Sequence, residues 1–340
     1  MEISDIQRYD SKKMYEAYDN WPKLAKEYYE KDFSKLEIDD IDHIVFAGMG
    51  GSGTIGDIIS SILSKTNIHV NVVKGYLLPK TVDSNTLVVA TSVSGKTDEV
   101  LSILKNSKNS KAKFISFSSN GDLEKISIEN NIEYIKIPQT HSPRASLPSF
   151  LYSVLNILGN IIPIKKNDVM ESISKLEQTQ KLISSSNLNE ENPSLSLANW
   201  IKNIPIIYYP GGLQATAFRF KSSLQENAKL HTIVEDVIEA CHNGIVAWET
   251  KTNVQPILIQ GYDDYIKTKE RWKIFKEFLQ SKRIDFKEIN SEDGNILSKI
   301  MYLIYLFDYT TIYHAVGSKI DPTPVKPIEF IKNRIVRQNY

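Results

Sequence analysis

The chain has 340 residues, a length that suggests two domains or one large domain. Its 41 lysines and arginines balance 41 aspartates and glutamates, and this zero net charge argues against a general nucleic-acid binder, which carries a basic patch. Cys241 is the single cysteine, which excludes an intrachain disulfide and a cysteine-based zinc site and fits a cytoplasmic location. The N-terminus is polar and no stretch reaches roughly 18 uninterrupted apolar residues, so we expect neither a secretory signal nor a membrane span.

The first 38 residues are expected to form a helical segment that packs on a core. Their apolar side chains recur at intervals of three and four residues, which is the spacing of one helix face. The residues in this pattern are Met14, Tyr18, Trp21, Leu24, Ala25 and Tyr28.

Residues 39–163 alternate between short apolar runs and helix-like segments. The runs are β-branched or aromatic and lie roughly 20–30 residues apart, a pitch typical of βαβ units around a buried parallel sheet. We therefore predict a doubly wound α/β domain that ends in a long apolar helix over 147–162. The predicted strands are 41–47, 70–73, 87–90, 114–117 and 134–137, and the predicted helices between them are 55–63, 99–105 and 123–129.

Residues 164–199 are rich in Lys, Glu, Ser and Asn and are predicted to be a helical linker with a loop over 184–194. The alternating pattern restarts over 200–340, where IPIIYYPGG repeats the strand and glycine turn of HIVFAGMGG. We therefore expect two flavodoxin-like αβα sandwiches, the second with a C-terminal helix. In such folds ligands bind beyond the carboxyl ends of the strands. The predicted strands of the second domain are 204–209, 257–260 and 284–289, and its helices are 213–227, 264–281 and 294–305.

A glycine turn over 48–53 follows the first predicted strand and precedes a helix. Glycine allows close approach of the backbone to an anion, and the amide groups at a helix N-terminus favour phosphate. A tight turn needed only for packing is an equally good interpretation. Although Gly48, Gly50 and Gly53 match a dinucleotide-binding fingerprint, the next strand ends near Val73, where it offers Lys74 and no acid for a ribose. A P-loop is excluded because no Gly-Lys-Ser/Thr follows at the required spacing.

A second turn, over 91–97, carries four hydroxyl side chains within seven residues. One hydroxyl suffices to cap a helix, so the excess favours a phosphate cradle over capping alone. Lys96 would be a possible positive charge beside it. Asp98 and Glu99 then open the helix, where acidic side chains suit the helix dipole.

At this point the sequence resembles a known family. SxSGxT after a strand is the signature of sugar isomerase (SIS) domains, which bind phosphosugars. GMGGSG upstream, PRA at 143–145, QENAK at 225–229, EACHN at 239–243 and the closing DPTPVKPIEFIK narrow the match. Together they resemble the bifunctional phosphoglucose/phosphomannose isomerases, best known from archaea, over the whole chain.

The resemblance implies a role for each matching residue. Arg144 would reach the C1–C2 region of the sugar, Glu226 would be the catalytic base, and His242 would arrive from the partner subunit of a homodimer to assist ring opening. Lys332 would join this site, although Lys326 is also near. The residues that would hold the phosphate are Gly51, Ser52, Ser92, Ser94 and Thr97.

Two family motifs are altered in this chain. The family turn is usually SYSGNTEE, and here Val93 replaces the tyrosine, Lys96 the asparagine and Asp98 a glutamate. EANHNE becomes EACHNG, with Cys241 and Gly244 at the changed positions. None of these changes removes a proposed catalytic group, and Lys96 places a lysine within the expected phosphate turn.

The implied chemistry suits these residue types. Aldose–ketose isomerisation moves a proton between C1 and C2 through an enediol, and one carboxylate can take and return it if its pKa is near neutral. A guanidinium stabilises the charged enediolate oxygen, and histidine can shuttle the proton that opens a cyclic sugar. We expect no cofactor and no metal for this reaction.

Each residue also has an ordinary structural interpretation. Glu226 would be an exposed helix residue, Arg144 a surface arginine and His242 a core histidine. Arg219 and Lys221 would form a solvated or ion-paired face, and His314 would be packed in the core. His231 and His242 lack the spacing and carboxylate partner of a metal site.

Two rival functions remain open at this stage. One is a non-catalytic phosphosugar sensor, although no helix-turn-helix module or basic segment is evident. The other is an isomerase of a different phosphosugar, such as an amino sugar or a pentose. A glucosamine 6-phosphate synthase would need an amide-transfer partner, and no N-terminal nucleophilic cysteine is present.

Overall fold

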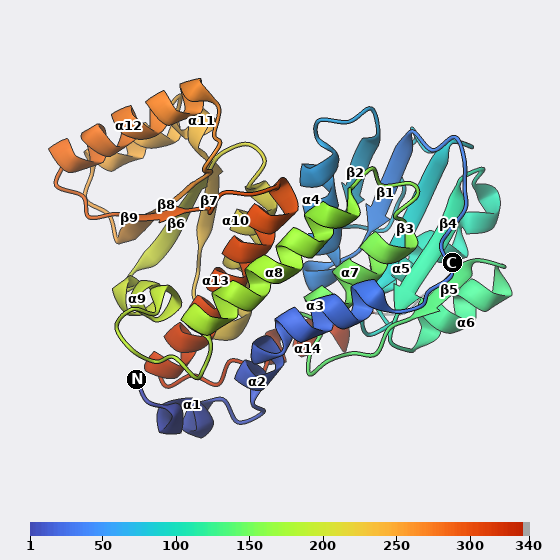
Figure 1. The fold of residues 1–340 in the computed structure, drawn as a ribbon, viewed down its shortest axis with the longest axis horizontal. Coiled ribbons are helices and arrows are strands. Elements are labelled where there is room, and N and C mark those ends of the chain that lie inside the picture. Colours follow the sequence, from blue (N-terminus) through green and yellow to red (C-terminus); the bar gives the residue numbers. More distant parts are fainter. Residues whose placement is uncertain (336–340) are drawn as a thin grey trace. The chain divides into compact units, whose positions relative to one another are not determined.

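The computed structural model describes residues 1–335, and residues 336–340, the end of the predicted second domain, lie outside the described residues. The chain folds into two compact units (Figure 1). The five-stranded unit comprises Lys23–Ile164 and residues 323–335. The four-stranded unit comprises Met1–Pro22 and Lys165–Pro322.

The five-stranded unit contains a fully parallel sheet in the order β2-β1-β3-β4-β5. Its two inner strands β1 and β3 are buried at every position, as expected for strands that helices cover on both faces. All five strands confirm the predicted apolar runs. Their bounds are β1 His43–Ala47, β2 His69–Val73, β3 Thr86–Ser92, β4 Lys113–Ser118 and β5 Glu133–Lys136.

The helices of this unit lie on both faces of the sheet. The chain passes from β1 to β2 in one direction and from β3 to β4 and β5 in the other, so right-handed crossovers place the connecting helices on opposite faces. The predicted helix over 147–162 ends earlier, at Ile157. The helices and 3-10 turn of this unit are α4 Gly50–Leu63, α5 Asp98–Lys105, η1 Ser107–Asn109, α6 Asp122–Glu129, α7 Leu147–Ile157 and α14 Lys326–Lys332.

The four-stranded unit repeats this plan with the order β7-β6-β8-β9, again fully parallel. Three of its strands were expected, whereas β7 was not predicted, because its four residues IVED contain only two apolar side chains. The strands are β6 Ile204–Tyr209, β7 Ile233–Asp236, β8 Val254–Gln260 and β9 Lys287–Asn290.

Helices make up the rest of the four-stranded unit. The long helix α13 extends to Gly317, well beyond the predicted end at 305, because its Tyr and Thr side chains are buried like the apolar ones. Trp21 and Tyr305 stack with ring centres 5.4 Å apart, which ties the N-terminal segment to α13. The elements are α1 Ile3–Tyr9, α2 Met14–Asp19, α8 Lys166–Ile183, α9 Pro193–Trp200, α10 Gln214–Ser223, η2 Leu224–Ala228, α11 Val237–Ala240, η3 Gly244–Glu249, α12 Ile266–Ser281 and α13 Ile296–Gly317.

The division into units differs from the predicted boundaries at both chain ends. Residues 1–22 group with the four-stranded unit, and α3 Trp21–Glu30 starts there and continues into the five-stranded unit. Residues 323–335 group with the five-stranded unit. The spacing of apolar residues shows which face of a helix is buried, but it does not show which hydrophobic core that face packs against.

Candidate active site

Two turns meet at one edge of the five-stranded sheet. The chain leaves β1 toward β2 and leaves β3 toward β4, so the adjacent carboxyl ends of β1 and β3 form the topological switch point. Ala47 and Ala90 are directly paired there. The glycine turn follows β1 and the hydroxyl turn follows β3, so both sequence motifs lie where such folds bind ligands.

The glycine turn exposes the start of α4. Gly50 is the first residue of the helix and has a φ of +52°, a left-handed conformation that suits glycine. A Cβ on Gly53 would lie 2.8 Å from the main-chain oxygen of Gly48, so only glycine fits this close approach. A Cβ on Gly50, in contrast, would meet no atom of residues 1–335 within 4 Å, which leaves open space beside the helix start.

The hydroxyl turn is organised around a pair of side chains. Ser92 Oγ and Thr97 Oγ1 form a hydrogen bond and lie 2.8 Å apart. Thr97 is the N-cap residue of α5, but within residues 1–335 its hydroxyl makes no capping bond to that helix. Capping alone therefore does not account for this turn.

The two turns are also joined to each other. The main-chain N–H of Val93 donates to Ser52 Oγ at 3.4 Å. Gly95 has a φ of +64°, and a Cβ there would overlap the main-chain oxygen of Asn120. The structure thus brings the hydroxyls of Ser52, Ser92 and Thr97 to one edge of one sheet.

Two lysines border these turns. Lys74 follows β2 and forms an ion pair with Asp57 of α4, with 2.7 Å between Nζ and Oδ2. Burial raises the pKa of the Asp57 carboxyl, and Lys74 partly opposes that shift. Lys96 is exposed in the hydroxyl turn itself.

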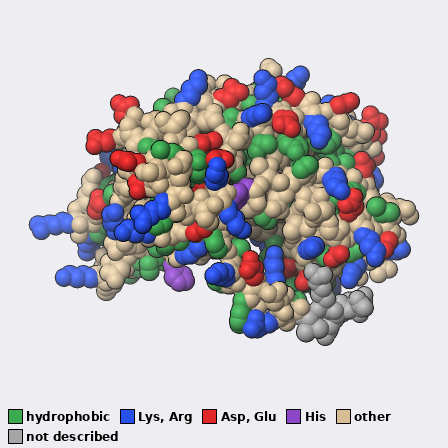
Figure 2. All heavy atoms as spheres, turned by 90° about the horizontal axis from the view of Figure 1, so that it is seen from below, with side chains coloured by type: hydrophobic (Ala, Val, Ile, Leu, Met, Phe, Trp, Pro, Cys, Tyr) green, Lys and Arg blue, Asp and Glu red, His purple; other side chains and the backbone are tan. Residues whose placement is uncertain are grey.

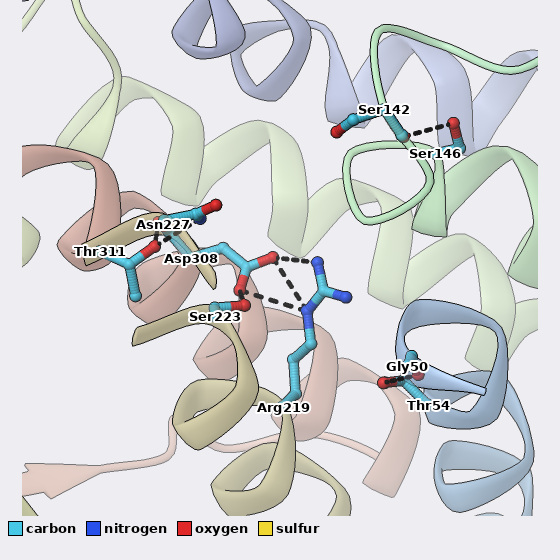
Figure 3. Close-up of polar contacts among 9 residues, drawn as sticks. All are labelled: Gly50, Thr54, Ser142, Ser146, Arg219, Ser223, Asn227, Asp308 and Thr311. Carbon is cyan, nitrogen blue, oxygen red and sulfur yellow. Dashed lines mark hydrogen bonds and ion pairs between the residues drawn. The ribbon is translucent and has the colours of Figure 1, made fainter. Parts of the chain in front are cut away.

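Arg144 is buried, with 5% of its surface exposed, so the interpretation as a surface arginine is wrong. Its Nη2 donates to the main-chain oxygen of Thr323 at 2.9 Å. The loop that carries it is closed by Ser146, whose Oγ donates to the main-chain oxygen of Ser142 at 2.9 Å (Figure 3). This loop lies between β5 and α7.

Glu226 lies on a π-helical turn, η2, that continues directly from α10. Such single turns are rare in proteins and often mark functional positions. The residues beside Glu226 bind α13: Asn227 Nδ2 donates to Thr311 Oγ1 at 2.8 Å, and Ser223 Oγ donates to Asp308 Oδ1 at 2.6 Å (Figure 3). The Glu226 side chain itself is half-buried, which disagrees with a fully exposed helix residue.

Arg219 is a buried residue of α10, so a solvated face is wrong and an ion-paired one is correct for it. Both Nε and Nη2 contact the Asp308 carboxylate, which is itself buried (Figure 3). Burial opposes the charge of Arg219, but the neighbouring Asp308 carboxylate raises the pKa of the guanidinium above its usual value. The pair fixes the helix that leads into the Glu226 turn.

His242 is exposed just after α11, which overturns its interpretation as a core histidine. Lys332 is the last residue of α14 and Lys326 the first, and both are exposed. Glu226 and His242 thus belong to the four-stranded unit, whereas Arg144, Lys332 and the glycine and hydroxyl turns belong to the five-stranded unit.

The equivalent turns of the four-stranded sheet have a different chemistry. The turn after β6 contains Gly212 with a φ of +94°, but the turn after β8 carries Asp263 and Asp264. Asp264 Oδ2 accepts from the Gly261 N–H at 3.0 Å and from Trp272 Nε1 at 2.9 Å. Carboxylates repel phosphate, so the internal repeat preserves the fold but not the anion-binding character.

Comparison with known proteins agrees with this geometry. The SIS domain model matches residues 37–151, and the model of the bacterial phospho-glucose isomerase C-terminal SIS domain matches residues 190–335. A bifunctional phosphoglucose/phosphomannose isomerase of Caldicellulosiruptor bescii is 32% identical over 336 residues, which cover 95% of this chain and 98% of the relative. The chain belongs to the bifunctional phosphoglucose/phosphomannose isomerase family.

Other matches are less similar to this chain. A D-glucosamine-6-phosphate 4-epimerase of Sulfolobus acidocaldarius is 28% identical over 251 residues, which cover 72% of this chain and 77% of the relative. The crystal structure of a glucose-6-phosphate isomerase-like protein from Thermus thermophilus shares the fold, with a TM-score of 0.62 at 15% identity over 98% of this chain and 99% of that one. The two doubly wound SIS domains predicted from the sequence are therefore confirmed.

Several residues that organise this isomerase were missed by the sequence analysis. Asp308 and Thr311 are buried in the largely apolar helix α13, and a buried carboxylate requires a partner. That signal was available in the sequence, but it could not name Arg219 and Asn227 as the partners.

The charged side chains on the surface of this family member are mixed in sign, in agreement with its zero net charge. On the face drawn in Figure 2, Lys and Arg side chains are interspersed with Asp and Glu. In residues 1–335, no helix is long and apolar enough to cross a membrane. Within the same residues, no cluster of three His, Cys, Asp or Glu side chains could hold a metal ion.

Proposed function

We propose that this protein interconverts glucose 6-phosphate and fructose 6-phosphate, and also mannose 6-phosphate and fructose 6-phosphate. The observation that carries the proposal is the 32% identity to a relative named for both activities, over 98% of that relative's length. The paired turns at the switch point support it, because they combine helix-start amides with hydroxyl groups that suit a sugar phosphate.

The phosphate of the substrate would be held by Gly51, Ser52, Ser92, Ser94 and Thr97. Ser92 and Thr97 share one hydrogen bond, so one hydroxyl proton remains to be donated to a phosphate oxygen. The start of α4 adds main-chain N–H groups and the positive end of a helix dipole. These are neutral donors, so recognition rests on hydrogen bonds and the helix dipole, with Lys96 as the nearby charge.

Glu226 would be the base of a cis-enediol mechanism. Its carboxylate removes the proton from C2 of the open-chain aldose while the carbonyl oxygen at C1 gains a proton, which gives the enediol. The same carboxyl then returns its proton to C1 as the O2 proton leaves and the C2 carbonyl forms. Arg144 would stabilise the negative charge that develops on the substrate oxygens while these protons move, and Lys332 would add a second positive charge.

Ring opening would be assisted by His242 from the partner subunit of a homodimer. The exposure of His242 supports this role, since a histidine that serves a second copy of the chain must be accessible before assembly. A cytoplasmic location follows from the same proposal, because sugar phosphates are intracellular metabolites.

Substitution of Glu226 by Gln tests the proposed base. The amide keeps the shape but cannot accept the proton, so turnover of fructose 6-phosphate should fall by about 10²- to 10⁴-fold while calorimetric binding persists. Glu270→Gln, on the exposed surface of α12, is the matched control. The wild-type reaction in D₂O should also place deuterium at C1 or C2. Near-normal turnover by Glu226→Gln would exclude the assignment.

A second candidate function arises from the epimerase relative. The turnover assay of the wild-type protein should therefore include glucosamine 6-phosphate alongside glucose, mannose and fructose 6-phosphates. Conversion of the amino sugar without isomerisation of fructose 6-phosphate would favour an epimerase. Binding of fructose 6-phosphate without any conversion would favour a phosphosugar sensor.

A further inference from the structure

Lys229 ends the π-helical turn that carries Glu226. It takes a left-handed backbone conformation, with a φ of 57° and a ψ of 31°. Non-glycine residues in this conformation carry backbone strain. Strain of this kind persists only where surrounding contacts hold it, and it concentrates at functional positions.

The side chain of Lys229 folds back over the turn. Its ammonium group lies 2.7 Å from the main-chain oxygen of Glu226 and 3.2 Å from that of Asn227. These carbonyls belong to the turn where the regular helix ladder ends, so they need donors from elsewhere. Lys229 therefore binds the backbone of the proposed base directly.

The same ammonium group also binds a distant part of the chain. It lies 2.9 Å from the main-chain oxygen of Asp321 and 3.1 Å from that of Pro322. An ammonium group has three N–H donors, so the four carbonyl oxygens share them. Lys229 thereby links the Glu226 turn to the segment that follows α13, while Asn227 links the turn to α13 itself.

We propose that Lys229 is a positioning residue of the isomerase, whose ammonium group holds the Glu226 turn against the carbonyls of Asp321 and Pro322. This inference rests on the proposed function, because it concerns the placement of the proposed base. Proton transfer between C1 and C2 depends on a carboxylate held at a fixed distance. A misplacement of about 1 Å can reduce the rate by about 10²-fold without removing any catalytic group.

Three variants test this role. Lys229→Met removes the ammonium group and keeps the chain length, whereas Lys229→Gly also relieves the backbone strain and so offsets lost stability. Lys319→Met is the matched control, because Lys319 is an exposed lysine with a φ of 59° in the same unit. For both Lys229 variants we expect kcat to fall by about 10- to 100-fold. KM and calorimetric affinity for fructose 6-phosphate should stay within about threefold, because the phosphate turns are untouched.

Amine rescue separates positioning from a purely structural role. n-Butylammonium replaces the side chain missing in Lys229→Gly and should restore kcat in a saturable manner. Tetramethylammonium has the charge but no N–H donor, so it should not rescue. If Lys229→Met fails to fold, Lys229→Gly decides the question.

The outcomes distinguish this inference from the proposed function. Active wild-type protein together with an unchanged kcat in Lys229→Gly would overturn the positioning role alone. A reduced kcat that n-butylammonium does not restore would also overturn it. Wild-type protein that isomerises none of the three sugar phosphates would overturn the proposed function, and this inference with it.

Discussion

Arg219 and Asp308 form a buried ion pair in which 2.6 Å separates Nη2 of the guanidinium from Oδ2 of the carboxylate. The Asp308 carboxylate also accepts the hydroxyl of Ser223, one residue before the π-helical turn. The pair joins α10 to α13 and thereby sets the position from which the Glu226 turn begins. A buried charge is tolerated here because its partner and hydrogen bonds are in place.

Removal of one member of this pair should strongly destabilise the protein. Arg219→Met leaves the Asp308 carboxylate buried and unpaired, and we expect a loss of about 3–5 kcal/mol in the free energy of unfolding. The double variant Arg219→Met/Asp308→Leu removes both charges and should recover most of that loss. Urea denaturation measures both values. A double variant no more stable than the single one would contradict the electrostatic explanation.

Gly95 and Gly50 are predicted to respond differently to alanine. Both have a positive φ, so alanine strains either site by about 1–2 kcal/mol. At Gly95 the added Cβ also overlaps the main-chain oxygen of Asn120, whereas the space beside Gly50 is open. Thermal denaturation should show a much larger loss for Gly95→Ala. Equal losses would mean that the Asn120 loop moves aside freely.

Subunit mixing tests whether His242 acts across a dimer interface. Glu226→Gln and His242→Ala are each expected to be impaired with cyclic substrate. If His242 serves the partner's site, a mixed dimer has one site with both defects and one intact site, so random mixing should restore about a quarter of wild-type activity. If it serves its own subunit, every mixed site keeps one defect and no activity returns.

His314 should make stability depend on pH. Burial lowers the pKa of this histidine below its usual value, although a hydrogen bond between Nδ1 and the main-chain oxygen of Ala198 at 3.1 Å partly opposes the shift. The unfolded chain therefore binds its proton at a higher pH than the folded one. The stability contributed by neutral His314 is complete above the unfolded pKa of about 6.5 and is lost as the pH falls through the lower, folded pKa.

Urea denaturation of His314→Gln between pH 7.5 and pH 5 checks this expectation. The variant should lose less stability over that interval than wild-type protein. His231→Gln changes an exposed histidine and is the control. The same pH dependence in wild type and His314→Gln would show that other groups cause it.

The sequence by itself determined the two parallel α/β domains and the positions of the glycine turn and the hydroxyl turn. Short apolar runs at regular intervals indicate strands that are buried on both faces. This signal depends only on residues close together in the sequence. The same is true of the hydroxyl excess at 91–97, which exceeds the need for one helix cap. Motif order then indicated Arg144, Glu226 and His242 as site residues.

Only the tertiary structure decided how these residues are held. The bond between Ser92 and Thr97, the pair of Arg219 with Asp308 and the carbonyls around Lys229 join residues up to 93 positions apart along the chain. The structure also places residues 1–22 in the four-stranded unit and residues 323–335 in the five-stranded unit, although each segment lies far in sequence from the rest of its unit. The spacing of apolar residues fixes which side of a helix is buried. Which element that side packs against depends on the packing of the whole folded chain and on the pairing of its buried charges.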